Sequence, residues 1–402
     1  MPRFEPFPGV RYDLARVDLD DVVAPPYDVI GPDDQLALEA RSPYNVVRID
    51  LARDEAGTDR YTAAGRRFDD WLAAGILRTD PEPGFYAYRM GYHDPEGLSR
   101  QIVGVLGALE VVAPGQGDVL PHEETQPKVR DDRLRLLRAC QADLSPVWGL
   151  SMAEGLTELA SAGGGAPVAR CTDEEGVHHR LWRLTQPGLV EAIAATVASA
   201  PVVIADGHHR YATALAHRDE VRAANGGAAP GADLLLALVC ELTDGQASVR
   251  PIHRVVRGLP GGFNLVAALE PFFEPAPAGA LASLPDRMAE AGALGLVLGP
   301  ERTFLLVPRA APGAGAGEPQ PDAALLDAAL AILPAHTLTF EHALDAVSAA
   351  VTSAPGTAAV LLRPVDVRQI ARTAVAGRTM PTKTTFFHPK PRTGMVFRRL
   401  SG

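Results

Sequence analysis

The sequence predicts a mixed α/β protein of the α+β class. Short apolar runs that alternate as strands do recur along the chain, and segments with apolar residues at helical spacing lie between them. With 402 residues and 47% hydrophobic content, the chain can form two or three domains with real cores. We expect an N-terminal α/β domain over residues 1–115, a central domain over 116–260 and a C-terminal α/β domain over 261–402.

The N-terminal region combines one clear helix with several extended segments. Residues 22–30, VVAPPYDVI, are expected to be extended because their prolines stiffen the chain, and residues 45–51, NVVRIDL, alternate as a strand does. Residues 60–77 have apolar residues at helical spacing and a glycine near the end, which predicts a helix. GFYAYRMGYH and RQIVGVLGALEVV are typical of two adjacent strands, which form a hairpin across DPEG.

The central region alternates strands and helices more regularly. Residues 131–141 predict a helix capped by an aspartate, and SPVWGL, APVARCT and VHHRLWRLT predict strands, the last two joined by the turn DEEG. Residues 187–199 predict a helix with proline in its first turn, followed by the strand PVVIA and a helix after GHHR. RPIHRVVRGL indicates an edge strand or a short element near a cleft.

The C-terminal region is rich in alanine, glycine and proline. Residues 308–324, PRAAPGAGAGEPQPDAA, are of low complexity and predict a surface loop. Two helical patterns and the strand AAVLLRP follow, and the tail TMPTKTTFFHPKPRTGMVF ends the chain.

Charge and composition exclude several classes of protein. The formal net charge of −11 argues against a broad surface for nucleic acid or anionic membranes, so neither is expected as a partner. Three widely spaced cysteines, with no CxxC pair, predict buried or inert thiols in a reducing compartment. The N-terminus lacks the apolar core of a signal peptide, and the longest apolar run is too short to cross a bilayer. We expect a cytoplasmic protein, and the sequence leaves its oligomeric state open.

The stretch PVVIADGHHRYATALAHRDE is the strongest candidate site. An apolar strand runs into Asp206 and Gly207, and glycine permits the sharp turn that the following helix requires. A helix that starts near His208 has unpaired N–H groups at the positive end of its dipole, which form an anion site. Arg210, His208 and His209 add donors, and Asp206 caps the helix or holds a divalent ion. The alternative is a capped helix whose polar residues satisfy one another.

Histidine chelation of a metal is the weaker interpretation of the same residues. His208, His209, His122 and His253 would have to converge, but adjacent histidines on a helix point in different directions. The i, i+4 spacing that suits zinc is missing.

The second candidate cluster is LPHEETQPKVRDDRLRLLRA. Glu123 and Glu124 precede Thr125 in a loop, where a carboxylate would accept the proton of a substrate hydroxyl, and a basic helix follows. The alternative is a solvated, salt-bridged helix.

Four further positions are candidates, each with a structural alternative. His253 and Arg254 are suited to anion binding, and Lys383 stands in a proline-flanked loop suited to phosphate contact. Tyr27 would pack against a site, with Asp28 as a capping or ligating group.

The common nucleotide-binding and hydrolase motifs are missing. The sequence has no GxxxxGK[ST] loop, no kinase-type HRD and DFG pair, no GxGxxG after a strand and no GxSxG. A phosphotransferase with this sequence would therefore be an unconventional one.

ADGHHRYATAL resembles the signature loop of the ParB/sulfiredoxin-like superfamily, in which a strand, a glycine turn and a helix hold nucleotide phosphates. Free-serine kinases of that superfamily carry a similar DGHHR stretch. VVAPPYDVI, NVVRIDL, PHEET, ADGHHRYATAL, RPIHRVV and MPTKTTFFHPKPRTGMVF also occur in the order seen in the bacterial family catalogued as domain of unknown function ten-fifteen. The chain is similar to that family over essentially its whole length.

The resemblance implies a central ParB/sulfiredoxin-like domain and phosphorylation of free L-serine, with pyrophosphate, ADP or ATP as donor. Gly207, His208, His209 and Arg210 would hold the donor phosphates, and Asp206 would stay near them as a cap or through Mg²⁺.

The resemblance also implies that Glu123 or Glu124 activates the substrate hydroxyl. We further expect Arg254 and Lys383 at the phosphates, and Tyr27, Asp28, His122, Thr125 and His253 at the small-molecule substrate.

One departure affects the pairing of these motifs. About eighty residues separate PHEET from ADGHHR, more than in compact members of the superfamily. The alternative function is a ParB-like nucleotide-binding, DNA-associated module without kinase activity, although the sequence shows no basic stripe. A non-catalytic scaffold with a vestigial phosphate loop is the third option.

Overall fold

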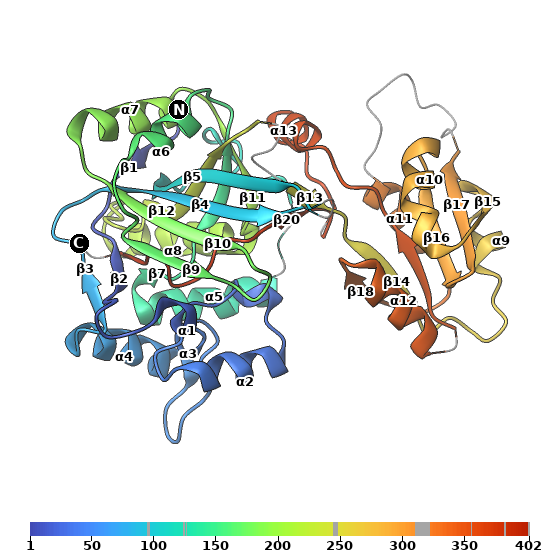
Figure 1. Cartoon of the computed structure of the whole chain (residues 1–402), viewed down its shortest axis with the longest axis horizontal. Helices are drawn as coiled ribbons and strands as arrows, with labels where there is room; N and C mark the ends of the chain where they lie inside the picture. Colours follow the sequence, from blue (N-terminus) through green and yellow to red (C-terminus); the bar gives the residue numbers. More distant parts are fainter. Residues whose placement is uncertain are drawn as a thin grey trace. The chain divides into compact units, whose positions relative to one another are not determined.

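The protein, described by a computed structural model, folds into two compact units (Figure 1). The first comprises Met1–Ser248, Ala371–Thr379 and Pro389–Gly402, and the second comprises Val249–Ile370 and Met380–His388. The structure describes residues 1–94, 97–123, 125, 127–243, 248–309, 322–354, 356–381 and 383–400. Sheets and helices build both units, which confirms the mixed α/β class.

A mixed nine-stranded sheet forms the centre of the first unit. Its order is β6-β11-β8-β12-β5-β4-β10-β9, and β1 pairs with β5. The bounds are β1 Phe4–Glu5, β4 Phe85–His93, β5 Ser99–Glu110, β6 Val119–Leu120, β8 Val147–Ser151, β9 Ala169–Thr172, β10 His178–Leu184, β11 Val202–Asp206 and β12 Leu234–Glu241. Because β12 pairs with β5, the regions 1–115 and 116–260 share this sheet.

Two predicted hairpins are confirmed. β4 and β5 pair antiparallel from His93↔Ser99 onward, and β9 and β10 pair antiparallel through His178↔Thr172. Residues 95–96, within the first turn, lie outside the described part. The alternating apolar residues of these strands pack in one buried cluster.

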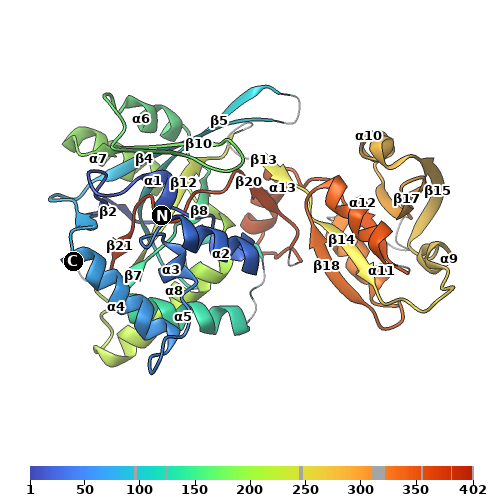
Figure 2. The same ribbon diagram turned by 60° about the horizontal axis from the view of Figure 1, so that its bottom comes forward.

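Helices cover both sides of the first unit's sheet. Figures 1 and 2 show α6 and α7 together on one side and α1 to α4 gathered on the opposite side. The bounds are α1 Leu19–Val22, α2 Pro32–Arg41, α3 Val47–Asp50, α4 Arg60–Ala73, α5 Pro127–Cys140, α6 Leu156–Ala162, α7 Pro187–Ala198 and α8 His208–Ala224, with a 3₁₀ turn at Tyr27–Val29. Two short pairs complete the unit: β2 Val10–Tyr12 with β3 Leu77–Thr79, and β7 Ala142–Asp143 with β21 Arg398–Arg399.

The strand predicted over residues 45–51 is wrong, because Val47–Asp50 within this segment form the helix α3. The side chain of Asn45 accepts a hydrogen bond from the N–H of Val47 at 3.0 Å and donates to the carbonyl of Asp21 at 2.8 Å. This local capping favours a helical turn, and burial of Val47 and Ile49 outweighs their β preference.

Two neighbouring predictions also need correction. The helix predicted over 131–141 is present, but α5 begins at Pro127, so Asp131 is inside it and does not cap it. The segment 22–30 is not extended throughout, because Val22 ends α1 and Tyr27–Val29 form the 3₁₀ turn.

The second unit is a six-stranded antiparallel sheet with helices on both faces. Its order is β15-β17-β16-β19-β14-β18. Neighbouring valines of β14 show the layering: Val256 packs with α9 and α11, while Val255 packs with α10 and α12. The bounds are β14 His253–Arg257, β15 Phe273–Gly279, β16 Leu294–Gly299, β17 Arg302–Pro308, β18 Thr337–Glu341, β19 Ala358–Leu361, α9 Leu265–Leu269, α10 Leu284–Ala291, α11 Asp322–Leu330 and α12 Leu344–Ser353, with a 3₁₀ turn at Leu281–Ser283.

The remaining elements are α13 Val367–Val375 and the paired strands β13 Ser248–Arg250 and β20 Phe386–His388. The prediction of an edge strand in RPIHRVVRGL is wrong, because β14 lies between β19 and β18. Of the low-complexity segment 308–324, residues 310–321 lie outside the described part, and α11 already begins at Asp322.

The predicted state of the cysteines is confirmed, since Cys140, Cys171 and Cys240 are all buried and unpaired. Within the described ranges, none of the helices combines the length and apolar character needed to span a bilayer.

Candidate functional site

The two candidate segments of the sequence meet at one edge of the nine-stranded sheet. β6 and β11 pair in parallel, with Val119 opposite Val202 and Leu120 opposite Val203. Parallel strands end on the same side of a sheet, so the segment after Leu120 and the turn after β11 emerge together. The backbone N–H of His122 donates to Nε2 of His208 at 3.3 Å, which joins the segments directly.

The turn between β11 and α8 is shaped by a bulge and a glycine. The register of β11 against β8 shifts between Ile204 and Asp206, and such bulges re-aim side chains at the end of a strand. Gly207 then takes the left-handed conformation, with φ of 91°, at the N-cap of α8. A Cβ at this position would lie 3.0–3.1 Å from the guanidinium of Arg210 and would push it aside, so glycine is favoured on two grounds.

Asp206 holds two cations at the start of α8. One carboxylate oxygen accepts a hydrogen bond from Nη2 of Arg210 at 2.8 Å, and the other accepts one from Nζ of Lys390. Burial alone would raise the pKa of Asp206, but the charges of Lys390 and Arg210 lower it from 3.8 to about 2. Asp206 is therefore ionised at neutral pH, and its geometry is that of a group that orients cations.

Arg210 is fixed on its other side by the loop before β8. Its Nη1 donates to the hydroxyl of Ser145 at 3.2 Å and to the carbonyl of Pro146. The side chain retains only 12% exposure. A guanidinium held in this way is pre-oriented at the positive end of the α8 dipole.

Lys390 is a site residue that sequence reasoning missed. Its side chain is 9% exposed, and its Nζ lies 3.9 Å from the carboxylate of Asp28. Burial would lower the pKa of Lys390, but Asp206 and Asp28 raise it above 10.5, so the group is a cation. The sequence offered one signal, the rarity of lysine: only three of the 38 lysine and arginine residues are lysines, and Lys390 is one of them.

The C-terminal tail holds Lys390 in place by backbone contacts. The N–H of Arg392 donates to the hydroxyl of Tyr88 at 3.1 Å. Thr393 and Ala24 exchange two backbone hydrogen bonds, at 2.9 and 3.1 Å. The tail therefore brings Lys390 beside the 3₁₀ turn that carries Asp28.

His208 and His122 contribute no charge to the site. Burial lowers the pKa of His208 well below 6.5, and burial lowers the pKa of His122 to about 4. Their rings meet edge to face at 4.6 Å. Since Nε2 of His208 accepts a hydrogen bond, this histidine is neutral, and its expected role at the donor phosphates stays a prediction.

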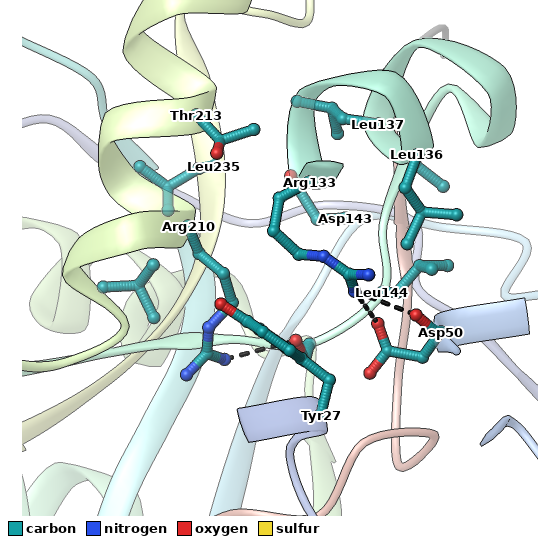
Figure 3. A pocket seen from close by; sticks show the side chains of 13 residues that line it. Tyr27, Asp50, Arg133, Leu136, Leu137, Asp143, Leu144, Arg210, Thr213 and Leu235 are labelled. Atoms are coloured by element: carbon teal, nitrogen blue, oxygen red, sulfur yellow. Dashed lines mark hydrogen bonds and ion pairs between the residues drawn. The ribbon is translucent and has the colours of Figure 1, made fainter. Parts of the chain in front are cut away.

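A small pocket lies beside Arg210, with Tyr27, Asp50, Arg133 and Ser145 among its lining residues (Figure 3). Its volume is about 60 Å³. The guanidinium of Arg133 stacks 4.3 Å above the ring of Tyr27 and donates to Oδ1 of Asp50 at 3.0 Å. Burial raises the pKa of Tyr27 to about 12, so its hydroxyl is protonated at neutral pH. The expected substrate residue Tyr27 therefore faces a pocket together with Arg133, which belongs to the predicted basic helix, and with Asp50, which the sequence did not indicate.

Other candidates lie in the second unit or outside the described residues. Nη1 of Arg254 donates to the carbonyls of Ile252 and Lys383, both at 2.8 Å, and His253 accepts from the N–H of Leu362 at 3.3 Å. These are contacts inside the second unit, and the expected ligand roles of Arg254, Lys383 and His253 stay predictions.

Glu123 and Thr125 lie in the segment between β6 and α5, and His209 lies in the first turn of α8. Glu124 lies outside the described residues.

The described residues do not fit a magnesium ion held by Asp206. Mg²⁺ takes oxygen ligands in octahedral geometry, but both oxygens of Asp206 already accept hydrogen bonds from cations. Across the described ranges, no group of three histidine, cysteine, aspartate or glutamate side chains is arranged to hold a metal.

Comparisons with known proteins give the following likenesses. A search of curated protein sequences found no match. A conserved hypothetical protein from Pyrococcus furiosus is 13% identical with a TM-score of 0.38, over 70% of this chain and 92% of that one. A free serine kinase in complex with AMP is 13% identical with a TM-score of 0.37, over 67% and 83%. SbnI with a C-terminal truncation, from Staphylococcus aureus, is 11% identical with a TM-score of 0.35, over 72% and 85%.

These solved structures assign no role to a residue of this chain. The model of a protein family described as "Protein of unknown function (DUF1015)" matches residues 4–334, which is more than half of the sequence. The chain belongs to the DUF1015 family.

Proposed function

We propose that the protein transfers a phosphoryl group to the hydroxyl of a small molecule, with free L-serine as the first acceptor to test. The observation that carries the proposal is the arrangement around Asp206. Two oriented cations, Arg210 and Lys390, stand at the N-terminus of α8, beside the segment that contains Glu123. Phosphoryl transfer depends mainly on positioning and charge neutralisation, which is what such a cluster supplies.

In the proposed reaction, the donor phosphates lie against Arg210, Lys390 and the first N–H groups of α8. His208 and His209 flank the same turn as further donors. The acceptor hydroxyl oxygen attacks the terminal phosphorus, its bond to phosphorus forms, and the bond from phosphorus to the bridging oxygen of the donor breaks. The hydroxyl proton passes to a carboxylate, either that of Glu123 or that of Glu124.

Asp206 has a positioning role in this proposal. A carboxylate with a pKa of about 2 is a weak base, but it holds both cations at the phosphates. Pyrophosphate, ADP or ATP is the donor, and Mg²⁺ enters as part of the donor complex, since Asp206 is already occupied by its two cations.

The direct test is a transfer assay with the purified full-length chain. The protein is mixed with Mg²⁺, L-serine and pyrophosphate, ADP or ATP, and phosphoserine is followed by ³¹P NMR. We expect phosphoserine with at least one donor, and its loss in Arg210→Ala.

Matched variants identify the carboxylate that acts as base. Of Glu123→Gln and Glu124→Gln, one should lose activity, while the exposed Glu154→Gln should keep it. Absence of phosphoserine with every donor would refute serine as the acceptor, and absence of transfer to any alcohol would refute the phosphotransferase.

A further inference from the structure

The pocket beside Arg210 contains a buried carboxylate oxygen without a donor. Asp50 is 4% exposed, and its Oδ1 accepts a hydrogen bond from Nη1 of Arg133. Its Oδ2 has no hydrogen-bond partner among the described residues. Figure 3 shows this carboxylate directed toward Arg133 and Tyr27.

A buried acceptor of this kind is unusual in a folded protein. The large majority of buried polar side-chain atoms are hydrogen-bonded, and charged groups lose the most when they are not. Burial raises the pKa of Asp50, while the charges of Arg133 and Arg210 oppose that rise. A cationic donor placed at Oδ2 would remove the penalty and form a charge-assisted hydrogen bond, which is stronger than a neutral one.

The arginines of the pocket already have anionic partners. Arg133 donates from Nε and Nη2 to Asp132, at 2.8 and 2.6 Å, in addition to its bonds to Asp50. Arg210 is paired with Asp206. Asp143, the other carboxylate that lines the pocket, is paired with Arg398 at 2.9 Å. Asp50 is itself ion-paired with Arg133 through Oδ1 at 3.0 Å, but its Oδ2 keeps no donor among the described residues, so this oxygen can accept a hydrogen bond from a bound cation.

The pocket is the size of a small acceptor. Its volume is about 60 Å³, and a water molecule needs roughly 10–15 Å³ of such space. About four to six water molecules therefore fit, which corresponds to a molecule of a few heavy atoms and excludes a nucleotide. Arg210 lines the same pocket and also contacts Asp206, so a hydroxyl at that end would face the proposed phosphate site.

We infer that Asp50 binds the ammonium group of a small 2-amino alcohol through Oδ2, so that the acceptor hydroxyl points toward Arg210. The inference rests on the proposed function and names the chemical class of its acceptor. L-Serine and ethanolamine belong to this class. Glycerate, which carries a hydroxyl where serine carries the ammonium group, does not.

Equilibrium binding tests this inference without turnover. L-Serine, ethanolamine and glycerate are titrated into the full-length chain in a calorimeter, with the wild type and two variants. Asp50→Asn keeps the size of the side chain and the acceptor for Arg133, but it places an NH₂ donor where Oδ2 stands. Asp131→Asn, at an exposed position of α5, removes one negative charge nearby and is the matched control.

For each of the two ammonium compounds, we expect the affinity of Asp131→Asn to lie within twofold of the affinity of the wild type. Asp50→Asn should bind them at least tenfold more weakly, and glycerate should bind the wild type at least tenfold more weakly than serine. Equal binding of serine by wild type and Asp50→Asn would overturn the inference. So would equal binding of glycerate and serine by the wild type, a comparison that needs no variant.

The binding experiment and the transfer assay can fail independently of each other. If neither ammonium compound binds the wild type, the ammonium site is refuted, while transfer from pyrophosphate to glycerol or glycerate would still support a phosphotransferase. If serine binds through Asp50 but no donor yields phosphoserine, the site stands and the proposed reaction fails.

Discussion

Replacing Lys390 with methionine tests how much its ion pair with Asp206 contributes to the free energy of unfolding. The variant keeps the length and apolar stem of the side chain but removes the cation that pairs with Asp206. In the folded protein the pKa of Asp206 is about 2, against 3.8 for the ordinary side chain. At about 1.4 kcal/mol per unit, this difference corresponds to about 2 kcal/mol of stability at pH 7.

The loss in Lys390→Met should be of that order. Breaking a buried ion pair costs about 3–5 kcal/mol when the remaining charge has no partner. Asp206 keeps Arg210, so we expect the free energy of unfolding to fall by about 2–3 kcal/mol. The exposed Lys128→Met on α5 is the control, with an expected change within about 0.5 kcal/mol.

The pH dependence gives an independent signature. Because the pKa of Asp206 is lower in the folded chain than in the unfolded chain, its stabilisation is complete above about pH 4. The stabilisation is lost as the pH falls toward 2. In Lys390→Met the folded pKa moves upward, so this acid-dependent loss should shrink.

Urea unfolding followed by tryptophan fluorescence is the assay. Trp71, Trp148 and Trp182 all lie in the first unit, and all are buried, so their emission reports on the unit that contains the site. A free energy of unfolding for Lys390→Met equal to that of the wild type, with the same acid profile, would refute the reasoning.

Two further predictions concern the turn and the buried histidines. Gly207→Ala should lower the free energy of unfolding by about 1–2 kcal/mol because φ is positive there, and should weaken pyrophosphate binding because Arg210 is displaced. Gly188→Ala, in the first turn of α7 with open space around it, should leave pyrophosphate binding unchanged and should not lower the free energy of unfolding, since alanine is favoured over glycine in a helix. Equal urea curves for the two variants would contradict this. The pKa of His122 falls from 6.5 to about 4, so its stabilisation is present above pH 6.5 and is lost as the pH falls to 4, by about 3 kcal/mol. His122→Asn should reduce the pH dependence of the free energy of unfolding between pH 6.5 and 4, whereas the exposed His178→Asn should leave this dependence unchanged. An unchanged pH dependence in His122→Asn would show that His122 does not titrate as described.

Features determined by neighbouring residues could be predicted from the sequence. The strand, glycine turn and helix at 202–224 follow from an apolar run, an Asp-Gly pair and a helical pattern, all within one short stretch. The two hairpins have alternating strands beside turn residues, and both are present. The meeting of the PHEET and ADGHHR segments depended on the family resemblance, and β6 pairing in parallel with β11 is its physical basis.

Features determined by distant contacts could not be predicted. Lys390 and Asp206 are 184 positions apart, and only the docking of the tail against Tyr88 and Ala24 brings them together. Asp50 belongs to a segment whose alternation indicated a strand, and tertiary burial made it a helix. The sequence indicated no role for its carboxylate, because the pocket that it lines with Arg133 and Tyr27 is formed by residues far apart in the chain. The neutrality of His208 likewise follows from burial, which no local pattern reports.

Calorimetric titration of pyrophosphate into the full-length protein tests the central claim most directly, since it asks whether Arg210 and Lys390 at the start of α8 receive a polyanion. The claim predicts one binding site in the wild type and in Lys128→Met, and binding at least tenfold weaker in Lys390→Met. Equal affinity in all three proteins, or no binding to the wild type, would contradict it.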